Sequence, residues 1–118
     1  MNTAANILIG FVAALHAWFL VLEMFLWDTP FGRRVFKLTP ESAASSRTLA
    51  ANQGLYNGFL AAGLAWGLAM GPDGFQVKCF FLACVIIAGV FGAATASRNI
   101  LFVQALPGIT ALAVLLAV

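Results

Sequence analysis

Four long apolar runs limit what this chain can fold into more than any other feature. They cover roughly residues 3–27, 51–70, 75–96 and 99–118. A helix needs about 20 mostly apolar residues to cross a bilayer, so each run is long enough for one membrane span. We therefore predict an all-α membrane protein in which residues 1–118 form a single domain, an antiparallel bundle of four transmembrane helices.

The composition agrees with this prediction. Hydrophobic residues make up 63% of the chain and charged residues 8%, whereas about a quarter of the residues in soluble domains are charged. The 118 residues leave no room for a separate soluble module, and a net charge of +2 is too small to indicate a nucleic-acid partner. We expect the lipid bilayer to be the main partner. Cys79 and Cys84 would point in different directions on a helix, so we predict neither a disulfide nor a metal site.

The basic residues predict how the spans are oriented. Tight breaks separate the later spans, at GPDG (71–74) and SRN (97–99), whereas residues 28–50 form one long connection. The positive-inside rule places the first and third connections in the cytoplasm, so both termini face out (N-out/C-out). We expect a multi-pass protein of the cell membrane, which is the inner membrane if the source has two membranes. The N-terminal MNTAANILIG has no basic residue before the apolar run, which favours a retained helix over a cleaved signal peptide. The basic residues of those two connections are Arg33, Arg34, Lys37, Arg47 and Arg98, and Lys78 alone lies on the other side.

A helix start is encoded inside the long connection. In TPES, Thr39 is a suitable N-cap, Pro40 is favoured at the first helical position, and Glu41 suits the first turn. We predict a helix that begins there and continues into the second span. Two interpretations of the preceding segment remain open: it lies on the lipid headgroups, or it is a solvated basic loop that only sets topology. The segment mixes apolar and basic side chains, namely Phe31, Arg33, Arg34, Val35, Phe36 and Lys37.

Polar residues from three spans are predicted to lie at a similar depth. Along helices that rise 1.5 Å per residue, Glu23 lies about 6 Å from the cytoplasmic end of its span, Asn57 about 9 Å and Gln104 about 8 Å. Gln53 is near the same end, and His16 is deeper, at about 16 Å. A charged group at mid-span costs about 2.5–3.5 kcal/mol, so an acid inside a span indicates a functional site by default.

Helical periodicity places several of these side chains on common faces. His16 and Glu23 are seven residues apart, and Gln53 and Asn57 are four apart, so each pair shares a face. We predict a polar pocket in the cytoplasmic half of the membrane, with Glu23 and His16 as candidate catalytic residues. An alternative stays open, in which the amides only join helices, each bond being worth about 0.6 kcal/mol, and His16 is a core histidine. The candidate ligand-binding residues are Gln53, Tyr56, Asn57, Gln104 and Trp27.

Two further features concern packing between the helices. GLYNG (54–58), GLAWG (63–67) and AGVFGAA (88–94) carry small residues at spacings that allow helix backbones to approach closely. Pro107 follows Gln104 by three residues, and because proline has no backbone N–H we expect it to loosen the fourth span there.

Four stretches, one in each span, carry a resemblance to a known family: HAWFLVLEMFLW (16–27), NQGLYNGFLAAGL (52–64), AGVFGAA and QALPGITAL (104–112). They resemble the small four-span integral membrane proteins of domain-of-unknown-function family 1304. The second stretch is the most specific, and together they make the match nearly full-length. The resemblance implies an integral membrane protein and supplies no activity, cofactor or catalytic residue.

Three functions fit these features and remain open. A membrane enzyme with isomerase- or cyclase-like chemistry would use Glu23 and His16 as proton-transfer groups on a lipid-soluble or small organic substrate. A proton-coupled transporter would resemble the small multidrug exporters, which are four-helix proteins that work as dimers. On this interpretation the chain could also form a homodimer. The Gln/Asn cluster and the long connection depart from the exporter pattern. A structural or accessory protein would use the polar residues only to join helices. We favour ligand binding over catalysis, and the sequence indicates no particular cofactor or ligand.

Overall fold

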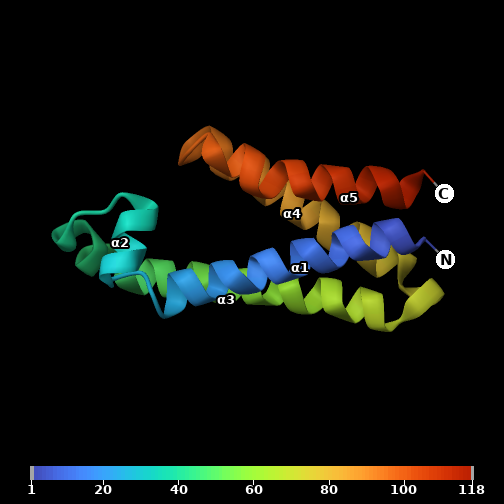
Figure 1. Cartoon of the computed structure of the whole chain (residues 1–118), viewed down its shortest axis with the longest axis horizontal. Coiled ribbons are helices and arrows are strands. Elements are labelled where there is room, and N and C mark those ends of the chain that lie inside the picture. Colours follow the sequence, from blue (N-terminus) through green and yellow to red (C-terminus); the bar gives the residue numbers. More distant parts are fainter. Residues whose placement is uncertain (1, 118) are drawn as a thin grey trace. The chain divides into compact units, whose positions relative to one another are not determined.

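The structure, a computed structural model, describes residues 2–117 and is all-helical over that range (Figure 1). A short 3-10 turn, η1 (Gly71–Gly74), precedes α4, and a π-helical segment, η2 (Leu101–Ala105), precedes α5. The α-helices are α1 (Thr3–Met24), α2 (Pro30–Phe36), α3 (Pro40–Ala69), α4 (Phe75–Thr95) and α5 (Leu106–Leu116).

Two stretches of helix in the described part of the chain are long and apolar enough to cross a membrane, by length and composition. They are Thr3–Met24, with a mean hydropathy of 2.1, and Gly71–Thr95, with a mean hydropathy of 2.3. The stretch Leu101–Leu116 is apolar but shorter. These helices correspond to the first, third and fourth predicted spans, and α3 contains the second. The prediction of a helical chain with membrane-length apolar helices is confirmed at this level.

The chain divides into two compact units. One, here called the central unit, is Leu15–Phe59 and holds the end of α1, all of α2 and the first part of α3. The other, here called the terminal unit, comprises the residues up to Ala14 and those from Leu60 onward. Each unit has its own polar contacts, and each is described by itself below.

In the central unit, α1 ends at Met24, three residues before the predicted end of the first span at Trp27. The chain then turns, and the Thr29 hydroxyl fixes that turn by donating to the Leu26 carbonyl at 2.6 Å and accepting the Gly32 N–H at 3.1 Å. Gly32 approaches the turn so closely that a Cβ there would lie 1.8 Å from the Leu26 carbonyl oxygen. The helix therefore ends early because of a local turn, although the apolar pattern continues past it.

The start of α3 confirms the predicted helix signal. The N–H of Ser42 donates to the Thr39 hydroxyl, and the N–H of Thr39 donates to the Ser42 hydroxyl, both at 3.1 Å. This reciprocal cap satisfies two backbone donors at the helix end. Upstream, α2 ends at Phe36 and is capped by Lys37, whose φ of 56° is left-handed. The long connection is therefore largely helical, and whether α2 lies on lipid headgroups stays a prediction.

The terminal unit has a continuous hydrophobic core. It forms where the first part of α1 meets the end of α3, α4 and α5. Helix α4 approaches η2 so closely that a Cβ on Gly89 would lie 2.9 Å from the backbone nitrogen of Ala105. This is the kind of close backbone approach that the small residues of AGVFGAA predict. The buried core residues are Ala5, Ile9, Val12, Leu64, Leu82, Val85, Ala111 and Leu115.

The π-helical segment confirms the predicted irregularity in the fourth span. The N–H of Leu106 bonds to the carbonyl of Leu101, five residues back instead of four. Pro107 follows at once and has no N–H to continue an α-helical ladder. The fourth predicted span is therefore a π-helical turn followed by the short helix α5.

Candidate ligand-binding site

A buried acid–amide pair lies at the centre of the candidate site. The Asn57 side-chain NH₂ donates to Glu23 Oε1 at 2.5 Å, joining the last turns of α1 to α3 within the central unit. Glu23 is only 9% exposed, and Asn57 is half-buried. The structure thus brings together two of the predicted site residues, which are 34 positions apart in the sequence.

Two glycines on α3 allow this contact. A Cβ on Gly54 would lie 3.0 Å from the Cβ of Glu23, and one on Gly58 would lie 2.5 Å from a methyl carbon of Leu20. Both glycines belong to the GLYNG motif, and they stand on either side of Asn57 along the helix. The Leu20 methyl group could move aside for a side chain at Gly58. Near Gly54, by contrast, the Cβ of Glu23 and the Leu20 carbonyl move only with α1. Gly54 therefore sets the distance at which the amide reaches the acid.

His16 lies on α1 two turns before Glu23. Its side chain is fully buried, and its ring meets that of Phe19 edge-on with the centroids 5.1 Å apart. A separation of seven residues corresponds to about 10 Å along a helix, so His16 and Glu23 share a face without direct contact. A ligand or a chain of water molecules could span the distance between the two side chains.

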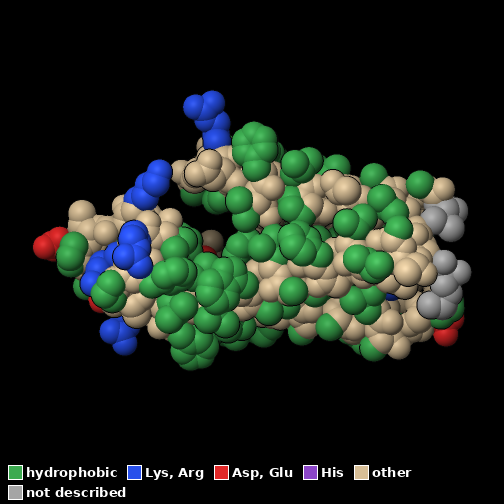
Figure 2. Space-filling model, in the orientation of Figure 1, with side chains coloured by type: hydrophobic (Ala, Val, Ile, Leu, Met, Phe, Trp, Pro, Cys, Tyr) green, Lys and Arg blue, Asp and Glu red, His purple; other side chains and the backbone are tan. Residues whose placement is uncertain are grey.

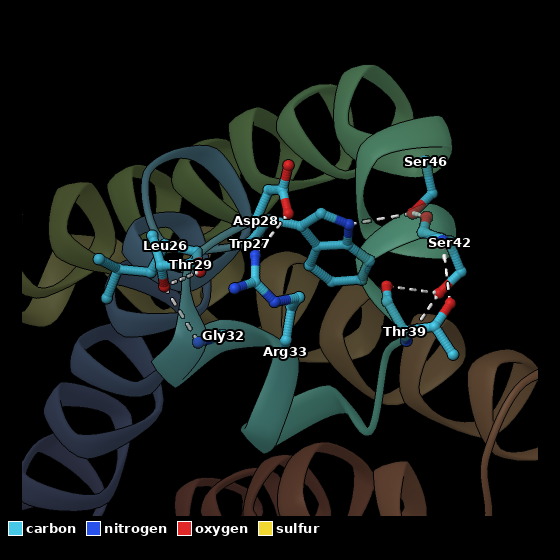
Figure 3. A network of polar contacts seen from close by, with 9 residues as sticks. All are labelled: Leu26, Trp27, Asp28, Thr29, Gly32, Arg33, Thr39, Ser42 and Ser46. Atoms are coloured by element: carbon cyan, nitrogen blue, oxygen red, sulfur yellow. Dashed lines mark hydrogen bonds and ion pairs between the residues drawn. The ribbon is translucent and has the colours of Figure 1, made fainter.

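Trp27 joins a second network, at the end of α1. Its indole N–H donates to the Ser46 hydroxyl at 3.0 Å, and that hydroxyl donates to the Ser42 carbonyl at 2.6 Å (Figure 3). The ring also lies 4.6 Å from that of Phe36. In Figure 3 the indole lies between α2 and the first turns of α3. Trp27 therefore connects the turn after α1 to α2 and α3, and this structural role accounts for the tryptophan without a ligand.

Gln53 and Tyr56 are placed differently from the prediction. Both are exposed, Tyr56 by 55%, and neither is hydrogen-bonded to Glu23 among the described residues. Tyr56 instead lies near Phe59, with the ring centroids 6.0 Å apart. Gln53 lies one turn before Asn57 on the same side of α3, but its side chain is exposed, so sharing a face did not place it in the buried contact.

Gln104 is hydrogen-bonded within the terminal unit. Its side-chain NH₂ donates to the carbonyl of Val85 on α4 at 3.0 Å. The side chain stands in the π-helical segment, next to the close approach of Gly89 and Ala105. Gln104 therefore joins η2 to α4 within the terminal unit. This is the role expected if the amides only join helices.

A hollow of about 360 Å³ lies in the central unit, just beyond the acid–amide pair along α1. Asp28, at its edge, forms an ion pair with Arg33 at 2.8 Å. Sequence reasoning assigned no site role to Asp28 or Arg33, although their acid–base spacing can be read in DTPFGR. Within residues 2–117 there is no cluster of three or more His, Cys, Asp or Glu side chains fit to hold a metal ion. The hollow is lined by Met24, Phe25, Trp27, Asp28, Thr29 and Arg47.

Comparison with known proteins agrees with the resemblance carried by the four stretches. The profile of the family described as "Protein of unknown function (DUF1304)" matches residues 10–116. The chain is also similar to the "Uncharacterized protein YpaA" of Lactococcus lactis, with 27% identity over 105 residues, which cover 86% of this chain and 88% of that protein. No solved structure matches the chain.

Proposed function

The chain belongs to the DUF1304 family, and from that premise we propose that it is a multi-pass membrane protein that binds a small or lipid-soluble ligand at the Glu23–Asn57 pair. The observation that carries the proposal is the burial of Glu23, at 9% exposed, inside an apolar helix with one amide as its hydrogen-bonding partner. Neither the family description nor the relative supplies a ligand, so the ligand's chemistry is argued from the pair itself.

The energetics are compatible with a binding role for Glu23. A charged group costs about 2.5–3.5 kcal/mol to insert at the centre of a span, and less toward the end, where Glu23 stands in the last turn of α1. A side-chain hydrogen bond between membrane helices contributes about 0.6 kcal/mol on average and about 1.7 at most. The single bond from Asn57 would offset only part of the mid-span cost and a larger part of the cost at the depth of Glu23. A ligand that donates to the acid would offset more of it.

The free atoms of the pair indicate what kind of ligand fits. Glu23 Oε1 is bonded by Asn57, which leaves Oε2 without a hydrogen-bonding partner among the described residues. The Asn57 NH₂ faces the acid, so its carbonyl oxygen is also left as an acceptor. Two acceptors on an apolar helix pair favour a molecule with a hydroxyl or amine group and an apolar body.

Acid–base chemistry on such a ligand is an extension of the proposal. His16 is fully buried on the same face as Glu23, about 10 Å away along the helix. A substrate that spans this distance would have a proton-transfer group at each end, as isomerase- or cyclase-like chemistry requires. Catalysis would be indicated if wild type converts the bound molecule and both Glu23→Gln and His16→Ala fail to convert it.

The proposed topology has four antiparallel spans with both termini outside. In this arrangement, α3 and the η2–α5 stretch supply the spans that accompany α1 and α4. Figure 2 shows Lys and Arg side chains gathered over α2 and the start of α3 in the central unit, with hydrophobic side chains covering the face beside them. Such a basic cluster favours the cytoplasmic side. A reporter active only outside the cytoplasm, fused at the C-terminus, should be active, and an inactive reporter would overturn this orientation.

The binding proposal is tested by identifying the small molecules that stay bound to the protein through purification. Wild type, Glu23→Gln, Asn57→Ala and Glu41→Gln are purified in a mild detergent, and their organic extracts are compared by mass spectrometry. Glu41 is the chain's other glutamate and is exposed at the start of α3, so Glu41→Gln is a matched control. Loss of one buried hydrogen bond, worth about 1–3 kcal/mol, corresponds to a loss of affinity of roughly 5- to 150-fold.

The expected result is a molecule enriched in wild type and in Glu41→Gln, and strongly depleted in the other two variants at equal folding by circular dichroism. Identical extracts from all four proteins would overturn the proposal. If the molecule is a lipophilic cation whose binding releases a proton, the exporter-like function is favoured over the enzymatic one.

A further inference from the structure

A buried lysine occupies the terminal unit, far along the sequence from the acid–amide pair. Lys78 is only 5% exposed, in the first turn of α4. Its Nζ donates to the Asn6 side-chain oxygen at 3.1 Å and to the Gly71 carbonyl at 3.5 Å. Its stem packs on α3, where a Cβ at Gly67 would lie 2.9 Å from the lysine Cγ. Lysine is almost never this buried unless it is paired, and here its described partners are neutral oxygens.

The position of Lys78 on its helix is unfavourable by itself. The N-terminal end of a helix carries a partial positive charge and disfavours a cation in the first turn. The N-terminus of α1 lies at the same cavity, where the Asn2 side chain accepts the N–H of Ala5 at 3.1 Å. Two positive helix ends and a buried ammonium group thus surround one space. An anion in that space would interact favourably with all three.

The space is a cavity of about 230 Å³ with hydrogen-bond donors in its wall. The Asn6 oxygen is occupied by Lys78, which leaves the Asn6 NH₂ as a donor. The ammonium group has three N–H bonds and two described acceptors, which leaves a third donor. At about 30 Å³ per water molecule, the volume is ample for a phosphate group. The wall includes Asn2, Asn6, Gly71, Pro72, Phe75 and Lys78.

We propose that this cavity is a phosphate-binding site, in which Lys78 and the Asn6 amide donate to a phosphate group at the N-termini of α1 and α4. Lys78 and the Asn6 amide would supply the donors, and the positive helix ends would add a favourable field for an anion. The phosphate belongs either to a lipid headgroup or to a free small molecule, and the chemistry of recognition is the same. The site lies entirely in the terminal unit and does not depend on the function proposed for Glu23.

Calorimetric titration of the full chain in a neutral detergent tests the proposal. The probes are dihexanoyl phosphatidic acid, inorganic phosphate, and dihexanoyl glycerol as the phosphate-free counterpart. Lys78→Met removes the charge, and Asn6→Asp places a carboxylate beside the ammonium group, where it competes with the phosphate. Lys37→Met and Asn99→Asp make the same chemical changes at exposed positions and serve as controls.

We expect a phosphate-bearing probe to bind wild type and both controls, and to bind Lys78→Met and Asn6→Asp about tenfold or more weakly. Binding of phosphatidic acid without inorganic phosphate assigns the site to a lipid headgroup, and comparable binding of both assigns it to a free anion. The proposal is overturned if neither phosphate probe binds wild type, or if dihexanoyl glycerol binds as well as phosphatidic acid. It is also overturned if Lys78→Met or Asn6→Asp binds like its control. If Lys78→Met does not fold, the comparison of Asn6→Asp with Asn99→Asp decides whether the proposal holds.

Discussion

Replacement of Gly54 by alanine should separate α1 from α3 at the acid–amide pair. A Cβ at this position would lie 2.8 Å from Cγ of Met24, 3.0 Å from Cβ of Glu23 and 3.3 Å from the Leu20 carbonyl oxygen. The methionine side chain can move, but the Glu23 Cβ and the Leu20 carbonyl move only with the backbone of α1. Overpacking of this kind costs about 1–3 kcal/mol.

Gly10→Ala is the matched control, because a Cβ at Gly10, also in the middle of a helix, meets nothing within 4 Å. Both substitutions gain the same helix propensity, about 0.8–1.0 kcal/mol, so that gain cancels in the comparison. The free energy of unfolding, measured by titration with sodium dodecyl sulfate in mixed micelles, should therefore be about 1–3 kcal/mol lower for Gly54→Ala than for Gly10→Ala. Equal stabilities for the two variants would refute the packing argument.

The same variant connects packing with function. If the pair binds the ligand, Gly54→Ala should also retain less of it than Gly10→Ala, because the amide no longer reaches the acid at 2.5 Å. Full retention by a destabilised Gly54→Ala would show that the ligand does not depend on the spacing of the two helices.

Three further substitutions test individual contacts. Trp27→Phe keeps an aromatic side chain but removes the N–H bonded to Ser46 and part of the ring that packs on Phe36, so the free energy of unfolding should fall by at least about 0.5–1.5 kcal/mol. In a double-mutant cycle with Ser46→Ala the losses should not add, and additive losses would contradict the bond. Thr39→Ala removes the cap shared with Ser42 and should lower the free energy of unfolding by about 0.5–2 kcal/mol, whereas Thr39→Ser should lower it little. Similar losses in the two variants would argue against capping. Gln104→Met should lower stability by about 0.6 kcal/mol and leave ligand retention unchanged; loss of the ligand would show that Gln104 does more than join helices.

Local signals in the sequence were sufficient for much of the fold. The cap at Thr39, the turn at residues 71–74 and the irregular turn before Pro107 each depend on a few neighbouring residues, and all three are found where the pattern predicts them. The end of α1 is different. It depends on the contact of Gly32 with the turn at Leu26, and a hydrophobic pattern that continues to Trp27 does not reveal it.

The candidate site was predictable only in part, for a similar reason. Depth along a helix follows from residue number, and it placed Glu23 and Asn57 at similar levels. Lateral position does not follow from depth, so Tyr56 was expected in the pocket although its side chain is exposed. Lys78 was counted only as a charge for topology, because nothing local indicates that its stem packs on Gly67 and its Nζ reaches Asn6.

The central claim is that the Glu23 carboxyl group binds the ligand, and its NMR signal tests this most directly. The chain has two glutamates, so the Glu41→Gln variant grown with ¹³C-carboxyl glutamate has a single labelled carboxyl group, that of Glu23. The resonance is recorded in membranes after the retained molecule has been removed and again as it is added back. The account predicts a saturable change in the Glu23 resonance that is strongly reduced in Asn57→Ala. A resonance that stays unchanged while the molecule binds would contradict it.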